Sequence, residues 1–490
     1  MLKISGQSRN TIEAGLRNKI VSADVYRSFL DIDKKDSIFN CVGNIAVYDA
    51  QHAPLYYILL NVWCRLFGGS IWTIRFLSVI FGILMLPLMY MLAMELFSDR
   101  TVAYVSLILL SLCPFHVLYA QEAKMYSLWA FTVLFSNIFL LRAARINSVK
   151  TWACYSISLI LGMYSHIFFV FVIMSHVLYI VLFEKGKRDM LRQRFGKALM
   201  GAGAAFLPWI YAMFVSYNPV HAAAWTSETL PLRALLKGWM INLTRVFIDI
   251  NADYRFDSPG LIYYAIPVLI LLIYAVRTSS KSMDRKPLIF ITAQLTIIAE
   301  FLILSDLIFG GRRSVVTRYF TPSILMLQLM LSYVLADRLR NTGIIKRIFL
   351  SCVIVCVIAG SVYSCGKNSG HTIWWNKYMA RELPKNIPAT AELIKAEYRP
   401  LVIIADNDNM ILPEIISLAN ILGPEADMLL LPESKGLPEL SGRGNVFILG
   451  PSIEYLRKLK KNCHYRLVYV DHPDISANRG LWKVLEKTRA

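Results

Sequence analysis

The sequence predicts an all-α, polytopic membrane bundle of about ten helices, followed by a small C-terminal α/β domain. Apolar residues make up 56% of the 490 residues and charged residues only 17%, whereas soluble domains carry roughly 25% charged residues. Apolar stretches long enough to cross a bilayer recur through most of the chain. Beyond residue 366, short apolar runs alternate with helical patterns. This composition excludes intrinsic disorder, a coiled coil and a small secreted disulfide-bonded protein.

Ten apolar stretches are candidates for membrane-spanning helices, because a bilayer core requires about 20 apolar residues per helix. Several contain a proline, which membrane helices tolerate better than soluble helices do. The fourth stretch is the shortest. In chain order, the stretches cover residues 71–97, 101–119, 124–141, 151–163, 167–183, 197–215, 261–277, 288–305, 319–336 and 348–365.

Basic residues concentrate in alternate connections between these stretches, at 98–100, 142–150, 184–197, 277–286 and 337–347. Positively charged connections stay in the cytoplasm, so the opposite connections and both terminal regions are predicted to lie outside. The net charge of +19 then reflects membrane topology, and nucleic acid is not expected as a partner. We therefore predict a multi-pass protein of the plasma (inner) membrane whose C-terminal domain is extracytoplasmic.

Three parts are predicted along the chain. Residues 1–70 form a first outer loop with interfacial helices, residues 71–365 form the transmembrane bundle, and residues 366–490 form the α/β domain. Within the bundle, the long outer loop 216–259 has apolar residues at helical spacing between Leu232 and Phe247, which indicates a helix lying on the membrane surface. No glycine fingerprint follows a strand in the C-terminal domain, so no nucleotide site is predicted there.

The first polar cluster directly precedes an apolar helix at the predicted outer face and contains Asp49, Gln51 and His52. An acid, an amide and an imidazole this close in sequence could bind a cation or orient a phosphate. The alternative is a simple helix start, with Pro54 in the first turn and the polar side chains as solvated caps. The sequence leaves both interpretations open.

The second polar cluster joins two predicted spans at residues 114–126 with almost no loop. Glu122 and Lys124 are therefore expected at membrane depth or just above it, where ionisable side chains are costly and often functional. The alternative is a local pair between Glu122 and Lys124 whose charged ends reach water.

The third polar cluster, residues 310–322, contains Arg312, Arg313 and Arg318 on the side that normally lacks positive charge. A guanidinium fork suits phosphate oxygens. The alternative is that these arginines contact lipid headgroups of the outer leaflet. His166 lies at this face too, where a structural histidine is an equal alternative. Together the three clusters predict a site that holds a lipid phosphate by its head while the lipid tail stays in the bilayer.

Three of these segments resemble motifs of a known family. They are residues 51–57 (Gln-His-Ala-Pro-Leu-Tyr-Tyr), residues 114–126 (Pro-Phe-His-x-x-Tyr-Ala-Gln-Glu-Ala-Lys-Met-Tyr) and residues 318–322 (Arg-Tyr-x-x-Pro). They are similar to bacterial GT-C glycosyltransferases, and more narrowly to the family 39-like, protein O-mannosyltransferase-related group. The resemblance implies a GT-C bundle in the membrane. It also implies transfer of a sugar from a polyprenyl-phosphate donor to an acceptor on the extracytoplasmic face.

The resemblance also assigns roles to residues. Glu122 corresponds to the acidic residue that positions the donor phosphate or a metal, so a divalent cation is the one cofactor suggested. His52 matches a region near the donor, and Arg318 with Tyr319 matches the Arg-Tyr region that meets the lipid phosphate. Lys124 stands where relatives often carry arginine. Glu122 is a predicted catalytic residue. The predicted donor-binding residues are His52, Lys124, Arg318 and Tyr319, together with Gln51, Arg313 and His166.

The family's general base is an aspartate in an Asp-Glu pair of the first outer loop, just before a Leu-Arg-Ile-Ser-Gly-like stretch. The similar stretch here is residues 2–6, Leu-Lys-Ile-Ser-Gly. We therefore expect the first membrane helix and its Asp-Glu pair to lie upstream of Met1. Asp49 and Asp24 are then the available carboxylates, and Asp49 is the candidate catalytic residue among them. Weak or absent activity is expected for residues 1–490. The expected reaction is an inverting single displacement.

Two other functions stay open at this point. A catalytically inactive GT-C scaffold would keep the fold and lose the base. A transporter or flippase for lipid-linked sugars would place ionisable residues near the bilayer midplane. The acceptor is left as a glycan, a lipid or a protein.

Overall fold

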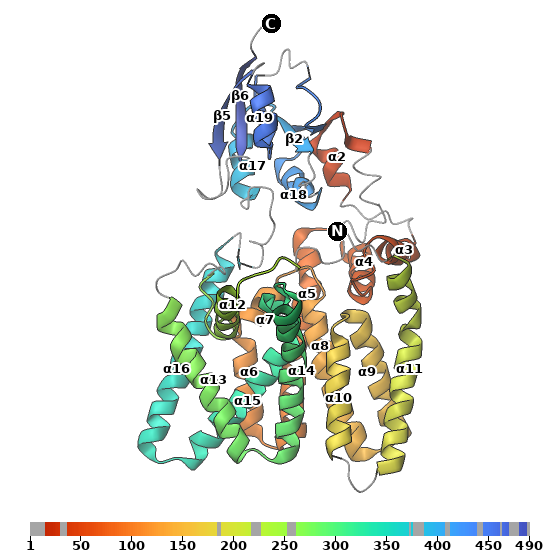
Figure 1. Ribbon diagram of the computed structural model, residues 1–490, viewed down its shortest axis with the longest axis vertical. Helices are drawn as coiled ribbons and strands as arrows, with labels where there is room; N and C mark the ends of the chain where they lie inside the picture. Colours follow the sequence, from red (N-terminus) through yellow and green to blue (C-terminus); the bar gives the residue numbers. More distant parts are fainter. Residues whose placement is uncertain are drawn as a thin grey trace. The chain divides into compact units, whose positions relative to one another are not determined.

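The computed structural model describes residues 15–29, 37–183, 188–216, 227–251, 261–371, 374–375, 387–406, 412–438, 444–460, 463–469 and 480–487. The chain forms two compact units (Figure 1). The membrane unit comprises Ile45–Gly370, and the α/β unit combines Met1–Asn44 with His371–Ala490. Residues 2–6, on which the expectation of an upstream helix depends, lie outside the described residues.

The membrane unit is a bundle of long helices that run between its two ends (Figure 1). Each predicted span is helical, and the second is broken into two helices with a bend of 57°. Among the described residues, seven helices are long and apolar enough to cross a membrane, and the bent pair would make an eighth. The elements are α4 (Leu55–Phe67), α5 (Ile71–Phe97), α6 (Arg100–Ser111), α7 (Pro114–Ala120), α8 (Tyr126–Ile146), α9 (Val149–Ser165), α10 (Phe169–Phe183), α11 (Arg188–Val215), α12 (Leu232–Thr244), α13 (Leu261–Ser282), α14 (Arg285–Phe309), the 3-10 helices η2 (Arg313–Val315) and η3 (Thr317–Phe320), α15 (Thr321–Asn341) and α16 (Ile344–Ser369).

Local sequence explains where several of these helices begin. The Asp99 carboxylate accepts hydrogen bonds from two backbone N–H groups in the first turn of α6. Ser148 begins α9 with a reciprocal capping box to Thr151. Pro114 occupies the first turn of α7, where its missing N–H is tolerated. Because proline cannot continue the preceding helix, α6 ends there and the span bends.

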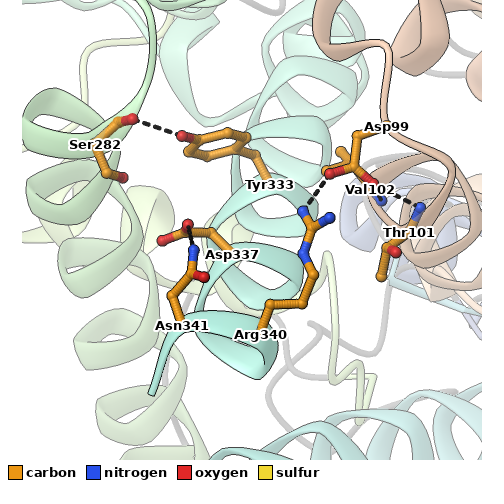
Figure 2. Close-up of polar contacts among 8 residues, drawn as sticks. All are labelled: Asp99, Thr101, Val102, Ser282, Tyr333, Asp337, Arg340 and Asn341. Carbon is orange, nitrogen blue, oxygen red and sulfur yellow. Dashed lines mark hydrogen bonds and ion pairs between the residues drawn. The ribbon is translucent and has the colours of Figure 1, made fainter.

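Figure 2 shows polar contacts at one end of the membrane unit. Asp99, which caps α6, forms an ion pair with Arg340 near the end of α15. The Tyr333 hydroxyl of α15 donates a hydrogen bond to the carbonyl oxygen of Ser282 at the end of α13, at 2.6 Å. These contacts bring three of the predicted cytoplasmic connections to the same end of the unit. That this end faces the cytoplasm stays a prediction from the charge pattern.

Close packing at the α9–α10 turn depends on a glycine. A Cβ atom added to Gly162 would lie 2.2 Å from the ring of Phe169, which is buried at the start of α10. Gly162→Ala is therefore expected to destabilise the chain by about 1–3 kcal/mol, because the ring and the helix must shift. The matched control is Gly203→Ala on α11, where nothing lies within 4 Å of the added atom. Equal thermal unfolding of the two variants in detergent would contradict this packing.

The α/β unit is built on a six-stranded sheet of order β1-β3-β2-β4-β6-β5. β2 is parallel to β3 and β4, and the other neighbouring pairs are antiparallel. Alternate residues of β2 face opposite layers, since Val402 and Ile404 pack with α17 and α18 while Leu401 and Ile403 pack with α19. The elements are β1 (Ile20–Ser22), α2 (Ala23–Ser28), α3 (Ile38–Tyr48), which leads into the membrane unit, α17 (Ile387–Lys395), β2 (Leu401–Asp406), α18 (Leu412–Leu422), β3 (Asp427–Pro432), β4 (Val446–Leu449), α19 (Ile453–Leu459), β5 (Cys463–Tyr469) and β6 (Leu481–Lys487).

These two units confirm the predicted fold class, an all-α polytopic membrane bundle with a small α/β domain. The chain is an integral, multi-pass membrane protein.

The N-terminal region contributes an edge strand to the α/β unit. Strand β1 pairs antiparallel with β3, and the N–H of Ala23 donates to the carbonyl oxygen of Ala426 at 2.9 Å. Arg17 forms an ion pair with Asp406 at 2.6 Å. The sequence analysis assigned these residues to a first outer loop, 1–70. A strand of three residues has no readable alternation, and its partner strand lies near the other end of the chain.

Candidate active site

The predicted site residues lie in four short connections at one end of the membrane unit. These connections link α3 to α4, α7 to α8, α9 to α10, and α14 to α15 through η2 and η3. Figure 1 shows α4, α7 and α12 together at this end. The end is opposite to the one that carries the basic connections, so it is the end predicted to face outward.

Glu122 lies in the tight turn between α7 and α8. The turn is held by a hydrogen bond from the Lys124 N–H to the Glu122 carbonyl oxygen, at 2.7 Å, and by one from the Ser78 hydroxyl to the Lys124 carbonyl oxygen, at 3.4 Å. The Glu122 side chain is buried, whereas Lys124 is exposed. Glu122 interacts electrostatically with both Lys124 and Arg318. The carboxylate is therefore buried beside two cations, one of them from a distant part of the sequence.

Arg318 in η3 is held between aromatic rings. Its guanidinium carbon lies 5.7 Å from the centroid of the Tyr126 ring and 5.5 Å from that of Tyr319. Tyr126 packs edge-to-face on Tyr119, with centroids 4.9 Å apart. Cation–π contacts of this kind help to fix the position of a guanidinium. Arg318 is half-buried, and the planar fork of a guanidinium suits phosphate oxygens.

Asp49, Gln51 and His52 form one hydrogen-bonded group. The Asp49 carboxylate lies 2.7 Å from Nδ1 of His52 and accepts a hydrogen bond from the Gln51 amide at 3.2 Å. The N-cap residue of α4 is Pro54, which makes no side-chain cap hydrogen bond. Asp49 interacts electrostatically with Lys124, which connects this group to the turn of Glu122.

His166 is buried in the turn between α9 and α10. Its Nδ1 accepts a hydrogen bond from the N–H of Phe168 at 3.1 Å, and its ring stacks on Trp129 with centroids 3.9 Å apart. Burial, with a smaller contribution from nearby His52 and Arg318, lowers the pKa of His166 to about 3. The ring is therefore neutral at pH 7. Because Nδ1 accepts the hydrogen bond within the turn, Nε2 is the ring nitrogen that could contact a ligand.

Arg313 and Arg312 each lie beside a carboxylate. The Arg313 guanidinium contacts the buried side chain of Asp306 at 3.2 Å, and that of Arg312 contacts Glu228 at 3.0 Å. Sequence reasoning missed Asp306 because it lies at the end of an apolar helix. A lone acid one turn before the Gly-Gly-Arg-Arg segment was the signal that could have found it. Arg318 is thus the arginine of this cluster that lies with Glu122.

Metal binding stays a prediction for Glu122. Among the described residues, no three side chains of His, Cys, Asp or Glu come together as a metal-binding group. Glu122 could supply one carboxylate ligand to a divalent cation, with phosphate oxygens supplying others.

Known proteins match this chain in part of its sequence and in its fold. The sequence model of the family described as dolichyl-phosphate-mannose-protein mannosyltransferase matches residues 51–211. No curated protein sequence matches the chain. Among solved structures, ArnT from Cupriavidus metallidurans bound to undecaprenyl phosphate aligns with a TM-score of 0.51 and 14% identity, over 94% of this chain and 92% of ArnT.

Two further structures align less closely. ArnT in the apo state gives a TM-score of 0.48 and 14% identity, over 96% of this chain and 95% of that chain. The archaeal oligosaccharyltransferase AglB from Archaeoglobus fulgidus, in complex with an inhibitory peptide and a dolichol-phosphate, gives 0.47 and 12% identity, over 77% of this chain and 56% of AglB.

The chain therefore has a GT-C-like fold, similar to that of ArnT, and residues 51–211 match the mannosyltransferase family model. Two of the three sequence motifs, at residues 51–57 and 114–126, lie within the matched residues, which supports the resemblance drawn from them.

Proposed function

We propose that this chain transfers a sugar from a polyprenyl-phosphate donor to an acceptor at the predicted outer face of the membrane. The observation that carries the proposal is the convergence of Glu122, Lys124 and Arg318 at one end of a membrane bundle. Two cations at that place suit a phosphate group whose lipid tail lies in the bilayer. The match of residues 51–211 to a family named for a dolichyl-phosphate sugar also supports this donor class.

In the proposed reaction, Arg318 and Lys124 bind the donor phosphate, and Tyr319, His52 and Gln51 complete the donor site. Asp49 takes the proton from the acceptor hydroxyl. The hydroxyl oxygen then attacks the anomeric carbon, and the bond from that carbon to the phosphate oxygen breaks. The lipid phosphate leaves with the electron pair, and the two cations stabilise its charge. A single displacement inverts the configuration at the anomeric carbon.

Binding of undecaprenyl phosphate by the full chain in lipid nanodiscs tests the donor class. We expect saturable binding of undecaprenyl phosphate and much weaker binding of undecaprenol, which has the same tail without the phosphate. Equal binding of the two lipids would contradict a phosphate site. Incubation with undecaprenyl-phosphate-linked sugars and NMR of the product anomer then tests transfer and inversion.

Glu122→Gln is expected to lower kcat/KM for the donor about tenfold, because a neutral amide no longer orients the two neighbouring cations. The matched control is Glu228→Gln, since Glu228 pairs with Arg312 and has no role in the proposed reaction. Sugar transfer by proteoliposomes containing the full chain measures both variants. If Glu122→Gln transferred sugar as well as the unchanged chain, Glu122 would not be part of the proposed site.

A further inference from the structure

We propose that helix α12 is a positioning element for Arg318, acting through Trp239, Asn242 and Arg245. This inference rests on the proposed function, because it concerns how the chain holds its phosphate-binding arginine. The three residues do not belong to the predicted donor site, and none of them is in the sequence motifs shared with the family.

The three side chains hold one continuous segment of backbone. They follow each other at intervals of three residues along α12 and its C-cap, so they form one stripe along the helix. Trp239 Nε1 donates a hydrogen bond to the Ser314 hydroxyl oxygen at 2.9 Å. Asn242 Nδ2 donates one to the Val315 carbonyl oxygen at 3.0 Å. Arg245 Nη1 donates one to the Thr317 hydroxyl oxygen at 3.4 Å. The next residue of the segment is Arg318.

Asn242 is the centre of this network. Besides its bond to Val315, its side-chain oxygen accepts hydrogen bonds from the Thr317 hydroxyl at 2.5 Å and from Arg245 Nη1 at 3.1 Å. Asn242 is 9% exposed and Arg245 only 2%. Buried polar networks whose members are bonded to each other rigidify the backbone around them. An arginine buried this fully at the edge of a membrane bundle therefore points to a function for the network.

The same segment is also held by α14. The Asp306 carboxylate accepts a hydrogen bond from the Ser314 N–H at 2.6 Å and contacts the Arg313 guanidinium. Residues 313–320 form two short 3-10 helices with few internal hydrogen bonds, so outside partners determine their position. Since α12 and Asp306 together hold residues 313–317, the geometry of Arg318 depends on them.

Replacement of Asn242 by alanine tests the inference. Asn242→Ala is expected to weaken undecaprenyl phosphate binding about tenfold in nanodiscs, since it removes two hydrogen bonds to the segment and one to Arg245. Asn242→Asp keeps the acceptor for Thr317 and Arg245 and is expected to recover most of the affinity. Arg233→Gln is the matched control for Arg245→Gln, because it makes the same change at an exposed position of α12. Arg233→Gln should leave binding unchanged.

A double-mutant cycle separates positioning from general loss of stability. If α12 acts through Arg318, Asn242→Ala should cause little further loss of affinity in a chain that already carries Arg318→Gln. Additive losses would overturn the inference. Trp239→Phe removes the indole N–H donor. It should weaken binding less than Asn242→Ala does, and it should also cause little further loss of affinity in a chain that carries Arg318→Gln.

Amide hydrogen exchange gives a readout that needs no ligand. Asn242→Ala should increase exchange in residues 313–318 while the helices of the bundle keep the exchange of the unchanged chain. Unchanged exchange in that segment would overturn the inference whatever the chain binds. If the unchanged chain fails to bind undecaprenyl phosphate but the exchange rises as expected, only the proposed function fails.

Discussion

Arg318→Gln is expected to weaken binding of undecaprenyl phosphate about 100-fold. Arg318 is half-buried, its guanidinium packs on Tyr126 and Tyr319, and it lies beside Glu122. Loss of a buried, hydrogen-bonded charge opposite a phosphate costs about 2–5 kcal/mol, and each 1.4 kcal/mol is about tenfold in affinity. Titration of the full chain in nanodiscs measures the change.

Two variants serve as controls for Arg318. Arg312→Gln is the same substitution on an arginine that pairs with Glu228, and it should bind like the unchanged chain. Arg318→Lys keeps the charge and loses the planar fork, so its affinity should lie between the two. If Arg312→Gln weakened binding as much as Arg318→Gln, the phosphate would be bound by general positive charge and not by Arg318.

Asp49→Asn is expected to lower the transfer rate by about 10²–10⁴, the usual contribution of a general base, while undecaprenyl phosphate binding stays within about twofold of the unchanged chain. The asparagine oxygen can still accept the hydrogen bonds of His52 and Gln51, so the local fold should persist. Single-turnover sugar transfer and nanodisc binding measure the two quantities separately.

Asp24→Asn is the matched control for the base. Asp24 is the other carboxylate singled out in the sequence, and it lies on α2 in the α/β unit, beside Arg27. We expect its transfer rate to equal that of the unchanged chain. If Asp49→Asn left transfer unchanged as well, Asp49 would not be the base.

The membrane bundle was largely predictable from the sequence because each span is a local property of its own residues. A run of apolar residues such as Ile71–Phe97 becomes one helix wherever it lies in the fold. The bend at Pro114 follows from proline chemistry. By contrast, β1 has three residues and gains its stability from pairing with β3, so no local pattern indicates it.

The site was predictable to a smaller extent. The tight turn around Glu122 and the arginines of 312–318 stood out because charge is rare beside membrane helices. The sequence could not distinguish Arg313 from Arg318, since the difference comes from Asp306, which lies at the end of an apolar helix and pairs with Arg313 only after folding. The contribution of Asn242 and Arg245 depends on α12 packing against η2 and η3, a tertiary contact with no spacing rule.

The central claim is that Glu122 and Arg318, from different turns, belong to one phosphate-binding site. A double-mutant cycle with Glu122→Gln and Arg318→Gln, read out as undecaprenyl phosphate affinity of the full chain in nanodiscs, tests it most directly. We expect the two changes to be coupled by about 1 kcal/mol or more, because the two charges interact. Effects that add to within about 0.3 kcal/mol would show that the two residues act independently, and would contradict the account.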